Sequence, residues 1–518
     1  MQTADKAEIK LHKIEQAKLD KPGLAVKEEL EHFAQIGWEA MDKTDLEVRL
    51  KWLGIFYRPV TPGKFMLRLR IPNGCLTATQ MSYLGEIVQR YGDDGSADIT
   101  TRQNIQLRGV RLEDIPAMFK RFQTLGLTSI QSGFDNVRNI TGSPVAGIDP
   151  DELIDTRELV QKLQDKITNY GEGNPEFANL PRKLNIAIEG ARDNSIHAEI
   201  NDIAFIPAYQ EGELGFNVIV GGYLSAQRCA ESIPLDVWVR ANDEVIDLSC
   251  AILKVYTEHG LTAGLRQNRG KSRLMWLIDK WSVEKFREVV EQEFGKPLAK
   301  ASAEDEISQD KKDHLGVYPQ KQGGYSYVGL HVPMGRLNAQ QMFDVARLAE
   351  VYGNGEIRLT VEQNLIIPYI KSENLTTFLA EPLLEQFTIN PPTLTRSVIS
   401  CTGARYCNFA IIETKQRALA LAQELDQELN IPQRVRIHWT GCPNSCGQAQ
   451  AGDIGLIGTK VKKNGKPDEG VNIYTGGKVG KEAKLGSLFA KGVACDDLKS
   501  QLKEVLIEQF GAIPKVSE

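Results

Sequence analysis

The sequence predicts an internally duplicated α+β protein with two similar halves in a pseudo-two-fold arrangement. A chain of 518 residues is too long for one ordinary hydrophobic core, so we expect several domains. Strand-like alternation over residues 64–71 precedes a helical pattern over 77–91 and a further strand-like run over 97–107. Such a mixture of strands and helices is typical of an α+β unit.

Blocks of the first half recur in the second half in the same order. The matching pairs are Ile71-Pro-Asn-Gly74 with Val332-Pro-Met-Gly335, Thr101-Arg-Gln-Asn104 with Val361-Glu-Gln-Asn364, and residues 181–186 with 432–437. The offset is 260 or 261 residues for the first two pairs and 251 for the third. In-order duplication implies two facing halves, and we expect a shared site in the cleft between them.

These patterns divide the chain into six segments. They are a helical extension (1–50), a small α+β unit (51–125), a larger domain (126–295), a linker (296–314), a second small unit (315–385) and a second larger domain (386–518). The extension places Leu30, Phe33, Ile36 and Trp38 at roughly helical spacing. The linker is polar and nearly free of bulky apolar residues.

Composition limits the classes of function. A net charge of −6 argues against a general nucleic-acid-binding protein, which would carry a basic footprint. No apolar run approaches the length of a membrane span. The first ten residues show neither a signal core nor a transit-peptide composition, so we expect a cytoplasmic protein.

Four of the eight cysteines form two tight pairs with the spacing C-x5-C-x34-C-x3-C, at Cys401, Cys407, Cys442 and Cys446. Two pairs of thiolates suit either a tetrahedral Zn²⁺ ion or a cubane iron–sulfur cluster. Structural zinc knuckles more often use C-x2-C or C-x4-C pairs in small domains, so the spacing favours a cluster over zinc. Disulfides are disfavoured in a reducing compartment.

The first half lacks these cysteines and carries cations instead. It has Ala191-Arg-Asp-Asn-Ser195 where the second half has Cys442-Pro-Asn-Ser-Cys446. Its candidate anion-binding residues are Arg102, Arg138, Arg182 and Lys183. Lys183 and Asn185 are two residues apart on a predicted strand, so both should face a small planar anion. The competing interpretation is that each cation is a solvated or salt-bridged surface residue.

Taken together, these motifs resemble the sirohaem-containing nitrite and sulfite reductases over residues 50–510. The resemblance rests on Gly441-Cys-Pro-Asn-Ser-Cys446 with its spacing, the duplicated blocks, and Leu180-Pro-Arg-Lys-Leu-Asn185. The nearest branch is the ferredoxin-dependent nitrite reductases of cyanobacteria and chloroplasts. It implies ferredoxin-like half-domains at 51–125 and 315–385, a sirohaem-binding domain without a cluster at 126–295, and a cluster-bearing domain at 386–518.

The resemblance also implies roles for particular residues. Cys401, Cys407, Cys442 and Cys446 would hold a [4Fe–4S] cluster, and Cys446 would also be the axial ligand of the sirohaem iron. Arg102, Arg138 and Lys183 fall on the family's anion-binding positions, and Arg182 lies beside them as a further candidate for cofactor binding. Sulfite reductases tend to carry a lysine where this chain has Asn185, which favours nitrite over the more highly charged sulfite.

The expected function is the six-electron reduction of nitrite to ammonia by a cytoplasmic, monomeric enzyme that takes electrons from reduced ferredoxin. The sequence contains no dinucleotide-binding fingerprint, so we do not expect the enzyme to take electrons directly from NAD(P)H. The alternatives are ferredoxin-dependent reduction of sulfite to sulfide and a non-enzymatic zinc or scaffold protein. The basic run around Lys462 and Lys463 is a candidate docking site for the acidic electron donor, or else a solvated hairpin tip.

Overall fold

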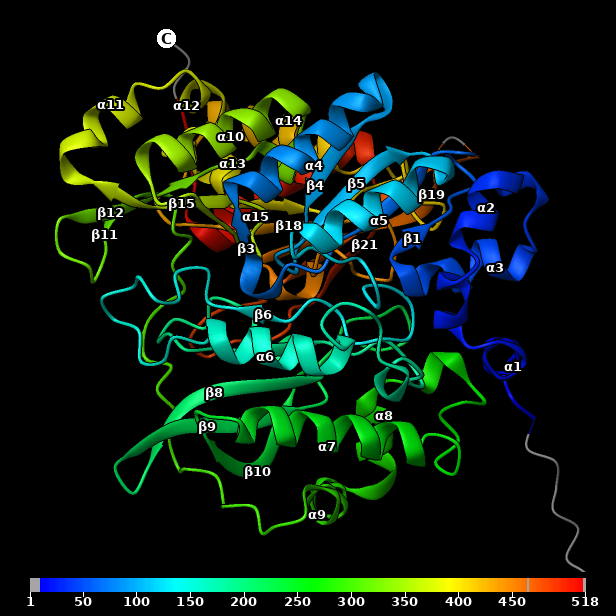
Figure 1. Ribbon diagram of the computed structural model, residues 1–518. Helices are drawn as coiled ribbons and strands as arrows, with labels where there is room; N and C mark the ends of the chain where they lie inside the picture. Colours follow the sequence, from blue (N-terminus) through cyan, green and yellow to red (C-terminus); the bar gives the residue numbers. More distant parts are fainter. Residues whose placement is uncertain (1–9, 464, 516–518) are drawn as a thin grey trace, which may run out of the picture.

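The computed structural model describes residues 10–463 and 465–515, so residues 1–9 of the expected helical extension lie outside the described part of the chain. Within these residues the strands form four five-stranded sheets and one two-stranded sheet, with helices packed against them (Figure 1). No helix of the described part is long and apolar enough to cross a membrane.

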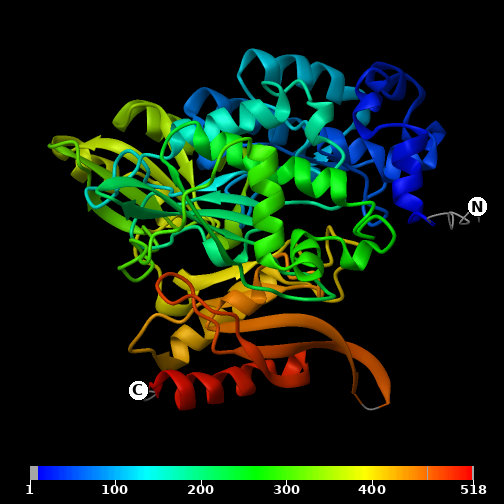
Figure 2. The ribbon, with the colours of Figure 1, turned by 90° about the horizontal axis from the view of Figure 1, so that it is seen from below.

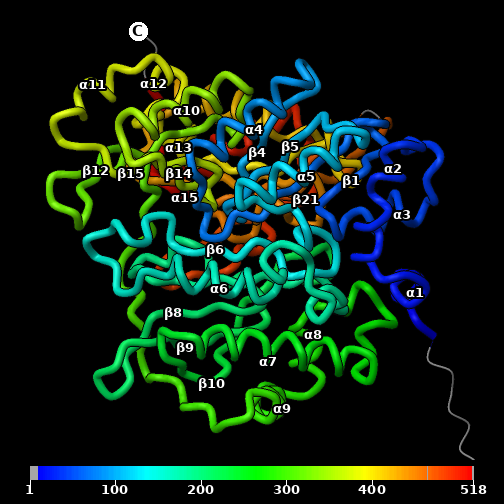
Figure 3. Tube along the Cα trace, viewed as in Figure 1, coloured from blue at the N-terminus to red at the C-terminus, as the bar shows by residue number. Residues whose placement is uncertain are grey.

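The N-terminal extension consists of short helices along one side of the molecule (Figure 3). They are α1 (Lys13–Asp20), α2 (Leu30–Ile36) and α3 (Lys43–Glu47). Leu30 and Phe33 are buried and join the core of the first small unit, whereas Ile36 is exposed. Val26, Met41 and Leu46 are buried in the same core, so the extension is anchored through several of its segments.

The two small units repeat the same succession of elements. The first contains β1 (Ile55–Phe56), β2 (Phe65–Arg68), β3 (Cys75–Thr77), α4 (Ala78–Arg90), β4 (Ser96–Ile99), β5 (Ile105–Val110) and α5 (Ile115–Thr124). The second contains β11 (Gly316–Pro319), β12 (Tyr325–Leu330), β13 (Arg336–Leu337), α10 (Ala339–Tyr352), β14 (Glu356–Leu359), β15 (Leu365–Lys371), α11 (Leu375–Leu379) and α12 (Leu383–Gln386). Both α4 and α10 begin in a capping box, Thr77 with Gln80 and Asn338 with Gln341.

Each small unit completes its sheet with a strand from the other. The sheet orders are β1-β2-β5-β4-β13 and β11-β12-β15-β14-β3, so β13 pairs with β4 and β3 pairs with β14. Helices α4 and α10 lie side by side over these sheets (Figure 1). Apolar residues of both units form one hydrophobic core. The two halves are thus joined at their centre, which fixes their relative position.

The larger domains also repeat one another. The first contains β6 (Thr141–Gly142), α6 (Arg157–Thr168), β7 (Ile186–Ile188), β8 (Ile203–Gln210), β9 (Glu213–Val220), β10 (Ile233–Arg240), α7 (Glu244–His259), α8 (Leu274–Trp281) and α9 (Val283–Phe294). The second contains α13 (Thr393–Ser397), β16 (Val398–Ser400), α14 (Lys415–Glu428), β17 (Leu429–Asn430), β18 (Ile437–Thr440), β19 (Ile454–Lys463), β20 (Lys466–Thr475), β21 (Ser487–Ala494), α15 (Leu498–Phe510) and β22 (Ile513–Pro514).

The two large sheets share one topology, and this topology positions the cysteines. In the first, β6, β7 and β8 run parallel and β9 and β10 follow antiparallel; in the second, β16, β18 and β19 correspond to the parallel strands. Helix α15 covers the second sheet (Figure 2). Loops at the carboxyl ends of adjacent parallel strands meet at one edge of a sheet. Cys401 follows β16 directly, and Cys442 lies two residues beyond β18.

The segment 296–314 that joins the halves forms neither an α-helix nor an extended strand. Its polar composition suggests a solvated connection, but its last residues are deeply buried. Lys311, Asp313 and His314 expose 7%, 7% and 2% of their surface. The end of the linker is therefore part of the interior between the two halves.

Candidate functional site

The four paired cysteines come together at the carboxyl edge of the β16–β18–β19 sheet. The backbone N–H of Gly441 donates to Sγ of Cys401 at 3.1 Å, which ties the two cysteine loops together. Burial, together with the neighbouring Cys446, Cys401 and Cys407, raises the pKa of the Cys442 thiol to about 11. Burial and Cys446 likewise raise the pKa of Cys401. The four sulfurs thus lie close enough to repel one another as thiolates.

The loop that carries Cys442 and Cys446 is shaped by its own backbone contacts. Ser445 has a left-handed φ of 49°, and its hydroxyl accepts from the N–H of Ala449 at 3.1 Å. A Cβ at Gly447 would lie 2.0 Å from the carbonyl oxygen of Trp439, so only glycine fits there. These constraints hold the loop against the end of β18.

Cys446 differs from the other three cysteines because it is exposed on the side that faces the first half. Thr101 Oγ1 donates to its carbonyl oxygen at 3.2 Å. Burial lowers the pKa of Arg58, Arg68 and Lys183, and Cys446 as a thiolate opposes this shift, so it lies within electrostatic reach of all three. Cys446 is therefore where the cysteine loops meet the cations of the first half.

Those cations form a group that lacks counter-charge. We call Arg58, Arg68, Arg102, Arg138 and Lys183 the cation group. Burial lowers the pKa of Arg102 to about 10, with a further contribution from Arg273. Burial and neighbouring cations also hold the pKa of Arg138 and Lys183 well below their usual values. Yet all five side chains keep some surface accessible to solvent.

Within residues 10–463 and 465–515, no carboxylate oxygen lies within 4.0 Å of a cationic nitrogen of the cation group. The predicted residue Arg182 differs, because its guanidinium lies 3.6 Å from Asp135. A desolvated group of cations without a directly paired carboxylate is suited to binding an anion. The expected shared site between the halves therefore has a cationic side and a thiol side.

Buried hydrogen bonds fix the backbone beneath the cation group. The Arg70 guanidinium donates to the carbonyl oxygens of Val137 and Arg138, at 2.7 and 3.1 Å. Asn139 Nδ2 donates to the carbonyl oxygen of Arg102 at 2.8 Å. Arg138 Nη1 donates to the carbonyl oxygen of Ser132 at 2.6 Å. The backbone that carries Arg102 and Arg138 is thus held in place before any ligand binds.

Asn185 lies between two guanidinium groups. With its amide oxygen turned toward them, it accepts from Arg102 Nη2 at 3.0 Å and from Arg273 Nη2 at 3.2 Å. Arg273 is itself paired with Asp202 at 2.5 Å. Asn185 is 2% exposed, and its amide oxygen contacts these two guanidinium groups. The Asn185 amide therefore orients Arg102.

Sequence reasoning did not single out Arg58, Arg68 or Arg273. Arg68 ends β2, in the alternating run 64–71, and a cation within an otherwise apolar strand was the available signal. Arg58 and Arg273 lie outside the repeated blocks and carry no motif. Only the fold shows that they reach the same site.

The donor set fits the two cofactors that the resemblance implies. Four clustered thiols with a backbone N–H on sulfur suit an iron–sulfur cluster. The unpaired cation group suits an anion bearing several carboxylates, as a sirohaem does. Among the described residues, no three His, Cys, Asp or Glu side chains converge as ligands of a single metal ion.

Comparisons with known proteins identify the family of this chain. Residues 133–298 and 393–510 match the "Nitrite and sulphite reductase 4Fe-4S domain", and residues 58–125 and 318–384 match the "Nitrite/Sulfite reductase ferredoxin-like half domain". The chain is 62% identical to the "Ferredoxin--nitrite reductase" of Leptolyngbya laminosa, over 98% of this chain and 99% of that one. It is 47% identical to the chloroplastic protein of the same name from Zea mays, over 97% and 90%.

A solved structure shows the same fold. The NirA protein of Mycobacterium tuberculosis matches with a TM-score of 0.87 and 31% identity, over 96% of this chain and 93% of that one. The predicted duplicated α+β fold, with its ferredoxin-like half-domains, is confirmed. The chain belongs to the nitrite and sulphite reductase family.

Proposed function

We propose that this chain is a ferredoxin-dependent nitrite reductase that converts nitrite to ammonia. The balanced reaction consumes one nitrite, six electrons and eight protons, and yields one ammonium ion and two water molecules. The observation that carries the proposal is the place of Cys446, which lies between three other thiols and the cation group. Two relatives that bear this function in their names, at 62% and 61% identity over nearly the whole chain, support it.

Two cofactors would be held by the residues described above. Cys401, Cys407, Cys442 and Cys446 would ligate a [4Fe–4S] cluster, and Cys446 would also ligate the sirohaem iron. The cation group, with Arg182 beside it, would bind the sirohaem carboxylates and the substrate. When bound, the two cofactors supply one-electron transfer to nitrite.

The residues of the chain handle charge and protons. Arg102, Arg138 and Lys183 neutralise the anion, and as N–H donors they order the water that delivers protons. Lys183 has a lowered pKa, so it gives up a proton more readily than an ordinary lysine. Asn185 acts as a positioning residue, because its amide orients the Arg102 guanidinium.

The electron donor would dock where the cysteine loops reach the surface. Next to Cys407 in the chain, Arg405 and Tyr406 line a hollow of about 190 Å³ together with Arg58, and Asp93 and Asp94 also line it. Phe409, two residues after Cys407, is 59% exposed. Cations around an exposed apolar side chain fit an acidic iron–sulfur protein such as ferredoxin. The earlier candidate Lys463 is instead paired with Asp496 at 2.9 Å.

The competing substrate is sulfite. Sulfite is largely a dianion near neutral pH and nitrite a monoanion, so a site with neutral Asn185 in place of a second lysine favours nitrite. Steady-state assays of the holoenzyme with reduced ferredoxin decide between them. We expect a higher kcat/KM for nitrite, and an equal or higher kcat/KM for sulfite would contradict the proposal.

A further inference from the structure

The second half carries a counterpart of the cation group at equivalent positions. Lys183 and Asn185 correspond to Arg434 and Arg436 at the offset of 251. Ala187 and His438 match at the same offset, and their strand partners are Thr141 and Ile399. Arg138 and Arg396 lie three residues before Thr141 and Ile399, respectively. The second half therefore has its own cation-rich surface, made by Arg396, Arg434 and Arg436.

The loop opposite these arginines is the counterpart of the Cys442–Cys446 loop. It runs from Ala191 to Ser195 and contains no cysteine. The two loops share a left-handed residue at the equivalent position, since Asn194 has a φ of 47° where Ser445 has 49°. Duplication thus produced two facing sites, of which only one has thiols.

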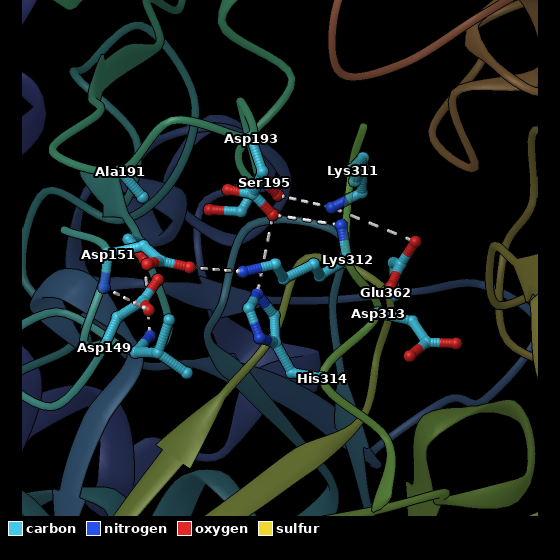
Figure 4. A network of polar contacts seen from close by, with 12 residues as sticks. Asp149, Asp151, Ala191, Asp193, Ser195, Lys311, Lys312, Asp313, His314 and Glu362 are labelled. Atoms are coloured by element: carbon cyan, nitrogen blue, oxygen red, sulfur yellow. Dashed lines mark hydrogen bonds and ion pairs between the residues drawn. The ribbon is translucent and has the colours of Figure 1, made fainter. Parts of the chain in front are cut away.

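The end of the linker fills the second site. We call residues 311–314 the plug; Figure 4 shows it among the surrounding polar groups. Lys311 Nζ donates to the carbonyl oxygen of Ser195 at 2.7 Å, and the N–H of Lys312 donates to Asp193 at 3.0 Å. His314 Nε2 lies 3.7 Å from the same Asp193 carboxylate. The plug therefore contacts the cysteine-free loop of the first half directly.

On its other side the plug contacts the arginines of the second half. Arg396 holds the Asp313 carboxylate with two bonds, at 2.5 Å from Nε and 3.0 Å from Nη2. Arg434 Nη2 lies 3.3 Å from the same carboxylate. Arg436 Nη2 donates to the carbonyl oxygen of Lys311 at 3.2 Å. Burial alone would raise the pKa of Asp313, but these arginines lower it overall, so the side chain stays charged.

A residue of the second half also makes room for the plug. Gly480 has a φ of 85°, and a Cβ there would lie 2.8 Å from the backbone N of Lys311. Upstream of the plug, the N–H groups of Ser308 and Gln309 both donate to the carbonyl oxygen of Arg192 at 3.0 Å. The linker is thus fitted to this site along several residues.

The two sites differ in where their negative charge comes from. The cation group has no carboxylate partner among the described residues, whereas Asp313 from the linker pairs with Arg396 and shares Arg434 with Glu362. We propose that Arg396, Arg434 and Arg436 form a second anion-binding pocket, specific for a carboxylate, and that the plug is its built-in ligand. This inference rests on the duplication and on contacts at the second site, and it holds whatever the substrate of the first.

Chemical rescue tests the pocket in the full-length holoenzyme. Asp313→Ala removes the internal carboxylate and leaves a space large enough for a small carboxylate. We expect a lower Tm in chloride buffer and a saturable recovery of Tm when acetate or formate replaces chloride at constant ionic strength. Asp313→Asn fills the same space without charge, so its lowered Tm should not respond to acetate. Asp151→Ala is the control, because it removes the exposed carboxylate that lies 3.3 Å from Lys312. We expect it neither to lower Tm in chloride nor to respond to acetate.

Several outcomes would overturn the proposal. One is an equal rise of Tm with acetate in Asp151→Ala or in the unmodified protein. Another is no rise of Tm with acetate in folded Asp313→Ala. The third is a recovery of Tm in chloride as large as that in acetate. If Asp313→Ala folds only during expression or refolding with acetate, that requirement supports the pocket. Failure to fold with acetate, while Asp313→Asn folds, contradicts it.

Discussion

Arg102 and Glu362 occupy the same position of equivalent turns in the two halves and carry opposite charges. Both turns are closed by the same backbone bonds, Thr100 N–H to Asn104 O and Thr360 N–H to Asn364 O, each at 3.0 Å. Arg102 belongs to the cation group near Cys446. Glu362 lies 3.2 Å from Arg434 and 3.9 Å from Lys311 in the plugged site. Duplication preserved the turn, and its two copies now serve different sites.

The first prediction compares these two residues. Glu362→Gln removes the buried carboxylate that Lys311, Arg434 and Arg436 share, although Asp313 still pairs with Arg434, so it should destabilise the fold by about 3 kcal/mol. Arg102→Gln removes a cation that has no carboxylate partner, so it should leave Tm nearly unchanged and lower kcat/KM for nitrite. Thermal unfolding and steady-state kinetics of both variants provide the check. Equal losses of Tm would contradict the division of roles.

The second prediction concerns substrate choice at Asn185. Asn185→Lys places a third cation beside Arg102 and Arg273, which favours the dianion, so the ratio of sulfite to nitrite kcat/KM should rise. Asn185→Asp is the matched control. Its carboxylate would pair with Arg102 and so weaken the binding of both nitrite and sulfite. An unchanged ratio in Asn185→Lys would show that this position does not select the substrate.

The third prediction concerns electron entry. Arg405→Glu reverses an exposed charge beside Cys407 and should lower ferredoxin-driven kcat/KM by about tenfold at low salt, since opposite charges speed association. Activity with a small dye reductant should stay intact. Lys462→Gln with Lys463→Gln tests the hairpin alternative, and Lys120→Glu on α5 is an exposed control. If only the hairpin variant lowers ferredoxin-driven kcat/KM, ferredoxin docks at the hairpin. Equal losses of activity with dye and with ferredoxin would contradict docking at either surface.

Sequence alone predicts the parts of this site that are fixed by local motifs. The cysteine spacing places Cys401 and Cys442 in two loops, and the duplication predicts that the other half faces them. Helix α4 begins and ends within one residue of its expected bounds. The expected strand at 97–107 is instead two strands, because Gln103 adopts a φ of 51° and closes a turn between them.

Features that depend on long-range packing could not be predicted. The exchanged strands β3 and β13 are two or three residues long, too short to show a periodicity. The plug has the composition of a solvated linker, and its burial depends on arginines more than 80 residues downstream. Arg58 reaches the thiols of the second half, and Arg273 reaches Arg102 through Asn185, only because separate domains pack together. The roles of all these residues in binding and catalysis stay predictions.

The fourth prediction is a pH dependence that comes from Glu199. Burial raises the pKa of this carboxyl to about 7, and its Oε1 has no partner among the described residues. Between the ordinary value of 4.5 and about 7, the folded state binds more protons than the unfolded state, so rising pH costs stability. Glu199→Gln should therefore raise Tm at pH 8 more than at pH 5. The prediction would be contradicted if Glu199→Gln changed Tm equally at both pH values. It would also be contradicted if the exposed control Glu213→Gln showed the same pH-dependent change in Tm.

The visible absorption spectrum of the purified protein, with and without nitrite, tests the central claim most directly. The claim is that the thiols at Cys446 and the cation group hold an iron–sulfur cluster and a sirohaem where nitrite binds. We predict strong visible absorption that changes when nitrite is added, and a loss of that absorption in Cys446→Ser. A colourless protein that contains zinc, or a coloured one whose spectrum ignores nitrite, would contradict the account.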